Sequence, residues 1–220
     1  PLLAPLTEGP LPPLAAVRPE HAGAAVEARL AEGRERLRRL EALLAEGLRG
    51  DGVPAPYEQL VLPLEELSER VGRPWEWLNH LKSVKDGQQL RAAMDELEPK
   101  VVRFWQTVSQ SKPVYAALLR LNASADFAQL SEAERAPHPS IRGELVSRRL
   151  NGMGLSEDAA KEFNRAQRKL QDLARTFENN LLDARKAWSV TLSDASAVRG
   201  LPDGALEAAA EAARREGAEG

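Results

Sequence analysis

The chain has 220 residues, of which 43% are hydrophobic and 29% are charged. These values are typical of a globular protein with a sizeable buried core. The 30 Lys and Arg residues are balanced by 33 Asp and Glu residues, and a net charge of -3 gives no electrostatic reason to expect nucleic acid or a membrane as a partner. The absence of cysteine excludes disulfides, thiolate metal sites and a cysteine nucleophile.

Residues 1–19 contain six prolines, and we expect them to form an extended lead-in rather than a helix. They contain no basic stretch followed by an apolar one, so we expect no secretory signal peptide there. No apolar run in the chain approaches the roughly 20 residues that span a bilayer. We therefore expect a cytoplasmic protein. Because the chain begins with Pro1 rather than Met, the alternative is an organelle (chloroplast or mitochondrion) reached after removal of a targeting segment.

Residues 20–220 are expected to form a single helical domain, because apolar residues recur at helical spacing. The clearest faces are Val26, Leu30, Leu37, Leu40 and Leu44 in a first helix, and Leu90, Met94, Leu97, Val101, Phe104 and Val108 in a third. A second helix is expected over 57–84, with Pro74 kinking or restarting it, and Pro99 is expected to bend the third. Shorter helices are expected from Pro113 to Leu121 and from Ile141 to Leu150, the latter ending at Gly152 or Gly154. Residues 122–140 are expected to form a loop, and the sequence after Ser131 is compatible with a short helix within it.

The longest helix is expected over 156–186. Its inner face would be Phe163, Ala166, Leu170, Leu173, Phe177, Leu181, Ala184 and Trp188, and we expect this face to pack along its whole length against antiparallel neighbours. Alternation of apolar and polar residues over 188–192 is compatible with a short strand. An alanine-rich helix should follow over 205–215. The predicted fold is all-α, an elongated antiparallel bundle of six or seven helices.

Candidate chemistry within the chain is sparse. The three histidines, His21, His80 and His138, share no i, i+4 face, so we expect neither a metal site nor a cofactor in this chain. Lys82 and Lys85 with Asp86 suit an anion such as a peptide carboxylate, but a solvated helix end is the favoured interpretation.

Two further groups of residues admit a binding role and a structural one. Asn179 and Asn180 lie within a helix, where a cross-link between helices is favoured over substrate contact. The tryptophans Trp75, Trp77 and Trp105 could form an aromatic ligand face, but core or interface packing is favoured.

Several segments resemble blocks of the N-terminal helical part of the oligopeptidase A and thimet oligopeptidase family of zinc metallopeptidases. The most specific are WLNHLKSVKD at 77–86 and FENNLLDA at 177–184. Weaker similarities, in the same order along the chain, lie at residues 1–3, 18–21, 90–91, 150–155 and 200–202. Residues 136–140, with two prolines, depart from the family pattern.

The resemblance implies that this chain forms one wall of a deep channel that admits short unstructured peptides. The family's His-Glu-x-x-His zinc helix occurs nowhere in the 220 residues, so zinc and the catalytic residues are expected in a catalytic domain outside this chain. Short peptides would be the substrate of the complete enzyme, and the catalytic domain of the same protein would be the partner. Candidate channel or interdomain contacts are His80, Lys82, Lys85, Asn179 and Asn180. The alternative is a free-standing helical module that binds peptides or a protein without cleaving them.

Overall fold

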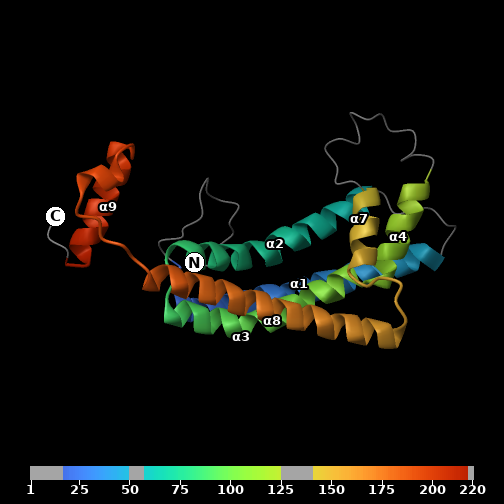
Figure 1. Cartoon of the computed structure of the whole chain (residues 1–220). Coiled ribbons are helices and arrows are strands. Elements are labelled where there is room, and N and C mark those ends of the chain that lie inside the picture. Colours follow the sequence, from blue (N-terminus) through green and yellow to red (C-terminus); the bar gives the residue numbers. More distant parts are fainter. Residues whose placement is uncertain (1–16, 50–56, 125–140, 218–220) are drawn as a thin grey trace. The chain divides into compact units, whose positions relative to one another are not determined.

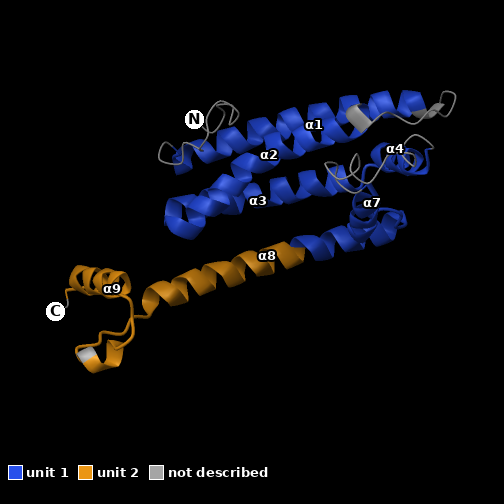
Figure 2. Ribbon diagram, turned by 90° about the horizontal axis from the view of Figure 1, so that it is seen from above, with its two compact units in different colours: residues 1–168 blue, residues 169–220 orange. Residues whose placement is uncertain are grey.

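The computed structural model of the chain describes residues 17–49, 57–124 and 141–217 (Figure 1). The chain divides into two compact units, residues 1–168 and residues 169–220 (Figure 2). The expectations for the lead-in at 1–16 and for the loop at 125–140 lie outside the described residues. All regular structure in the described ranges is helical, which confirms the predicted all-α class.

Within the described residues, the first unit contains five complete helices and the beginning of a sixth. In chain order they are α1 (Pro19–Arg49), α2 (Tyr57–Val84), α3 (Gln88–Ser109), α4 (Lys112–Ala123), α7 (Ile141–Leu150) and the first turns of α8 (Glu157–Ala187). Helix α1 is central, because it packs against α2, α3 and α4, while α7 packs against α4. Figures 1 and 2 show α1, α2 and α3 running side by side.

The core of this unit forms where the helical periodicity predicts it. Every residue of the two predicted faces in α1 and α3 is buried, from Val26 to Leu44 and from Leu90 to Val108. Leu60, Leu67 and Leu78 of α2 join them, each 1% exposed or less. The α-helical assignment continues through Pro74 in α2 and Pro99 in α3, so α2 does not restart at its proline.

One glycine sets how closely the three long helices approach. A Cβ atom on Gly33 of α1 would lie 2.7 Å from Cγ2 of Val71 in α2 and 2.8 Å from Cζ of Phe104 in α3. Both distances are well below van der Waals contact, so no larger residue fits without moving a neighbour. The absence of a side chain at Gly33 therefore permits the α1–α2–α3 crossing.

The second unit contains α8 from residue 169 onward, the 3₁₀ helix η2 (Ala195–Val198) and α9 (Asp203–Arg215). No residue of α8 or α9 is buried. The prediction that the face from Phe163 to Trp188 packs along its whole length is therefore wrong. Periodicity identifies which face of a helix is apolar, but it does not establish that the chain supplies a partner for that face.

Residues 188–192 have no regular secondary structure, so the short strand does not form. A strand needs a second strand to pair its backbone groups, and no strand occurs in the described ranges. A search of the same ranges for a membrane-crossing helix finds none of sufficient length and apolarity.

Candidate functional site

The family-like segment at 77–86 forms the end of α2 and its turn into α3. Leu78 is fully buried and anchors this end of α2 in the core. Gly87 precedes α3 in an extended conformation and caps it without a side-chain hydrogen bond. The Asp86 carboxylate, 5% exposed, accepts hydrogen bonds from Arg91 Nε at 2.8 Å and Arg91 Nη2 at 2.5 Å. This bidentate pair ties the turn to the first turns of α3.

A pocket of about 530 Å³ lies beside this turn. The pocket lies between the start of α1, the end of α2 and the start of α3. Its lining includes Arg18, Leu81, Lys85 and Gln88. Lys85 lies directly after α2 and is exposed, and its backbone N donates to the carbonyl oxygen of Leu81 at 2.7 Å. The pocket thus combines an apolar wall with cationic side chains at its edge.

The three site residues predicted at the end of α2 and just after it, His80, Lys82 and Lys85, have different surroundings. Lys85 lines the pocket, whereas His80 is exposed and is not among the lining residues. The side chain of Lys82 is 8% exposed, so the interpretation of a solvated helix end is wrong for Lys82 and holds for Lys85. Lys82 is buried because it follows Leu78 by one turn and shares its inward face.

The tryptophans are structural, as predicted. Trp75, Trp77 and Trp105 are partly buried and pack against the core cluster. Trp105 also meets Phe104 edge to face, with ring centroids 5.0 Å apart.

Asn179 and Asn180 lie in the part of α8 that belongs to the second unit. The side chain of Asn180 is exposed. Oδ1 of Asn179 is shielded from solvent, yet among the described residues it accepts no hydrogen bond. The predicted cross-link between helices through this oxygen is therefore not made within the described chain. A buried carbonyl oxygen that accepts no hydrogen bond destabilises the fold. Of the two asparagines, Asn179 is the one whose side-chain oxygen lacks a donor among the described residues.

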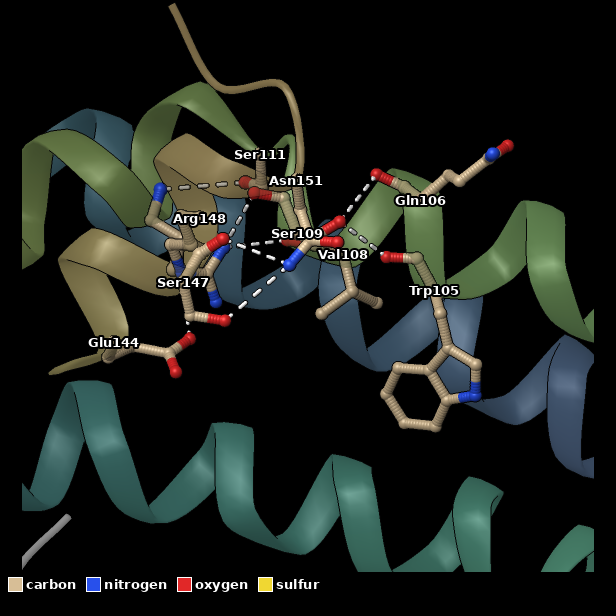
Figure 3. A network of polar contacts seen from close by, with 10 residues as sticks. Trp105, Gln106, Val108, Ser109, Ser111, Glu144, Ser147, Arg148 and Asn151 are labelled. Atoms are coloured by element: carbon tan, nitrogen blue, oxygen red, sulfur yellow. Dashed lines mark hydrogen bonds and ion pairs between the residues drawn. The ribbon is translucent and has the colours of Figure 1, made fainter. Parts of the chain in front are cut away.

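Sequence reasoning missed a polar network between the end of α3 and α7 (Figure 3). Arg148 of α7 is 3% exposed, and its Nη1 donates to the carbonyl oxygens of Val108 at 2.7 Å and Ser109 at 3.4 Å. These carbonyls end α3, where the helix itself supplies no further donor, and Val108 O also accepts a long hydrogen bond of 3.4 Å from Ser111 N. Arg148 Nε lies 2.9 Å from Glu144 Oε1, an ion pair without the alignment of a hydrogen bond.

Burial lowers the pKa of the Arg148 guanidinium, and the Glu144 carboxylate offsets part of that effect. A signal for Arg148 exists in the sequence. It occupies the third position of the series Ile141, Leu145, Arg148, whose first two members are buried apolar residues. A charged residue at such a position predicts a buried guanidinium with a specific partner.

The start of α8 is attached to the same junction. Gly152, with φ +94°, leaves room for Phe163 of α8, since a Cβ there would lie 3.0 Å from Cδ1 of that ring. Gln110 Nε2 donates to Asn151 O at 2.9 Å and to Asn164 Oδ1 at 2.7 Å. The α7–α8 turn at Gly152 and Gly154 agrees with the predicted end of α7. The network is structural in character, because its donors and acceptors satisfy helix ends and turns.

The described residues do not fit a metal centre. They contain no group of three or more His, Asp or Glu side chains placed to share one ion. A zinc site needs three or four such ligands converging on one point.

Comparison with known proteins gives the affiliation of the chain. Residues 26–160 match the family model of the neurolysin/thimet oligopeptidase N-terminal domain. The probable cytosolic oligopeptidase A of Arabidopsis thaliana is 34% identical over 208 residues, which cover 94% of this chain and 28% of that protein. The organellar (chloroplastic/mitochondrial) oligopeptidase A of the same plant is 36% identical over 83% of this chain and 22% of its own length.

Oligopeptidase A of Haemophilus influenzae is 33% identical over 96% of this chain and 29% of its own length. The chain thus spans less than a third of the curated relatives it matches. The family model covers most of the first unit, and the longer alignments extend into the second. The chain belongs to the neurolysin/thimet oligopeptidase family, as its N-terminal domain.

Proposed function

We propose that this chain is the channel-forming N-terminal part of an oligopeptidase A-like zinc metalloendopeptidase that hydrolyses short peptides. The observation that carries the proposal is the alignment with oligopeptidases A over nearly the whole chain, 94% in one plant relative and 96% in a bacterial one. All three relatives described are oligopeptidases A by name. A domain shared over nearly its full length with such proteins is expected to share their architecture.

Catalysis is assigned to the remainder of the complete polypeptide. Zinc in such enzymes polarises the scissile carbonyl and activates a water molecule. The 220 residues contain no His-Glu-x-x-His sequence, and the described ones gather no ligand set. No step of the hydrolysis is therefore assigned to a residue of this chain.

The predicted site residues are proposed as contacts to peptide or to the neighbouring domain. Lys85 stands at the edge of the pocket, where its ammonium suits a peptide carboxylate. The enclosed Oδ1 of Asn179 suits a donor N–H from a partner segment. His80 and Asn180 are exposed and available to either, while Lys82 contributes from a buried position.

Reconstitution from two separate chains tests the proposal. This chain would be mixed with the remainder of the complete polypeptide, and cleavage of an internally quenched short peptide would be followed. We expect zinc-dependent hydrolysis in the mixture, abolished by a chelator, and none from this chain alone. Hydrolysis by the remainder that is unchanged on adding this chain would contradict the channel role. Chelator-sensitive hydrolysis by this chain alone would contradict the assignment of catalysis elsewhere.

A second candidate is a peptide-binding module without catalysis, and the pocket beside Lys85 is the observation that favours it. Calorimetry with short peptides separates the two functions. Micromolar affinity for this chain alone, with no activity on mixing, would favour the module. For the compartment we propose the cytoplasm or an organelle. The plant relatives include one protein of each kind by name.

A further inference from the structure

Helix α8 carries a row of large apolar side chains that nothing in the described chain covers. We call Leu170, Leu173, Phe177 and Leu181, with Trp188 just beyond the helix, the α8 stripe. Their exposed fractions are 58%, 54%, 68%, 44% and 72%. We infer that the α8 stripe is the surface on which the remainder of the complete polypeptide docks. The inference rests on the proposed function and adds to it the place of contact.

The helical members of the stripe form one row. They are spaced three, four and four residues apart, which places them on one side of α8. At about 1.5 Å per residue, Leu170 to Leu181 extends for roughly 16 Å along the helix. Contiguous apolar surfaces of this kind on globular proteins mark sites of association.

The opposite side of the same helix is polar, so the stripe is not one part of a uniformly apolar segment. Asp172 and Arg175 form an ion pair of 3.2 Å there, and Asn179 follows Arg175 by one turn. An amphipathic helix of this length gains its stability from packing of its apolar side. Within the described residues that packing is not supplied, since no residue of α8 is buried.

The length of the relatives indicates what covers the stripe. An alignment that covers 94% of a 220-residue chain must extend across residues 170–188, so the segment that carries the stripe lies within the part shared with the plant relative. The same alignment covers only 28% of the plant protein, which leaves more than two thirds of its length to provide a cover. The members of the stripe are uncharged and bulky, and this suits the apolar side of a folded neighbouring domain. A second copy of this chain is the alternative outcome.

Hydrogen–deuterium exchange tests the inference in two forms of the protein: this chain alone and the complete polypeptide. Amides over residues 170–181 are expected to exchange at least about tenfold more slowly in the complete polypeptide, which corresponds to burial of one large apolar side chain. Leu173→Glu should abolish this difference in exchange between the two forms, because it places a charge in the proposed apolar interface. The matched control, Gln171→Glu, introduces the same charge on an exposed position of α8 outside the stripe and should leave the protection intact.

Equal exchange in the two forms would overturn the inference, as would protection that survives Leu173→Glu. Concentration-dependent dimers of this chain, dispersed by Leu173→Glu in sedimentation, would assign the stripe to a second copy instead. Leu181→Ala, a milder change, serves if the charged variant of the complete polypeptide fails to fold, and it should reduce the protection in part. Zinc-dependent peptidase activity is measured separately. Protected amides without activity would reject the proposed function and keep the docking surface.

Discussion

The side-chain amides of Gln110 and Asn164 bond to each other in both directions. Gln110 Nε2 donates to Asn164 Oδ1 at 2.7 Å, and Asn164 Nδ2 donates to Gln110 Oε1 at 3.1 Å. The two residues lie 54 positions apart in the sequence, after the last turn of α3 and near the start of α8. This pair, with Gln110 also bonded to Asn151 O, holds the first turns of α8 against the end of α3.

A double-mutant cycle measures that pair. Gln110→Ala and Asn164→Ala should each lower the free energy of unfolding by about 1–2 kcal/mol, because each leaves a partly buried amide without its partner. The double variant should cost less than the sum of the two, with a coupling of about 0.5–3 kcal/mol in urea titrations. Strict additivity would show that the two amides do not interact in solution.

Arg148 is expected to be the most sensitive charged residue of the chain. Arg148→Met removes the hydrogen bonds from the guanidinium to Val108 O and Ser109 O and should cost about 1–3 kcal/mol, the usual cost of removing one partner of a buried hydrogen bond. Arg148→Lys should recover only part, because an ammonium lacks the planar fork of a guanidinium. Arg142→Met, an exposed change on the same helix, is the control and should stay within about 0.5 kcal/mol. Equal effects at the two positions would contradict the buried role of Arg148.

Two glycines of α1 should respond to alanine in opposite directions. Gly33→Ala places a methyl group 2.7 Å from Val71 and should cost about 1–3 kcal/mol through overpacking. A Cβ on Gly47 meets nothing within 4 Å, so Gly47→Ala should stabilise by about 0.5–1 kcal/mol through helix propensity. Thermal unfolding of both variants checks the contrast. A stabilising Gly33→Ala would mean that the three helices are further apart than described.

Replacement of leucine by alanine should cost much more stability in α3 than in α8. Leu97→Ala in α3 should cost about 2–5 kcal/mol, since this side chain is buried in the core. Leu173→Ala in α8 should change the stability of this chain by less than about 0.5 kcal/mol, because its side chain is 54% exposed. Denaturant titrations of the two variants decide the matter. A large loss of stability in Leu173→Ala would show that this face of α8 is packed, as the sequence alone predicts.

The stability of the chain should fall in acid partly through Glu32. Its carboxylate accepts hydrogen bonds from Arg29 at 2.6 Å and Arg36 at 2.9 Å. Burial raises the pKa of Glu32, but the bonds from the two arginines outweigh it and the pKa lies below its usual 4.5. A pKa that is lower in the folded chain than in the unfolded one adds stability above the unfolded value, and this is lost as the pH falls.

We therefore expect the free energy of unfolding to decline from about pH 5 downward, and Glu32→Gln to make that decline shallower. Arg36→Gln, which removes one of the two donors, should give an intermediate slope. Chemical denaturation at a series of pH values provides the measurement. If the free energy of unfolding of Glu32→Gln falls with pH as steeply as that of the unchanged chain, Glu32 does not contribute to the loss of stability in acid.

Local sequence patterns determined the helices and most of the core. The face from Leu90 to Val108 is buried as its spacing predicts, and α7 ends at the glycines that permit a positive φ. Helix periodicity is a local property, so these features follow from residues within a few positions of one another. The family-like segments at 77–86 and 177–184 likewise indicated the affiliation that the comparisons establish.

Only the tertiary structure decided which predicted faces find partners. It buries Lys82, expected to be solvated, and leaves Leu173 and Phe177 exposed, although their spacing is as regular as that in α3. It also joins Arg148 to Val108 and Gln110 to Asn164, pairs separated by 40 and 54 positions. A contact between distant residues depends on the path of the whole chain, whereas amphipathicity records only that a helix requires a partner. The α8 stripe has that pattern without a partner in the described chain.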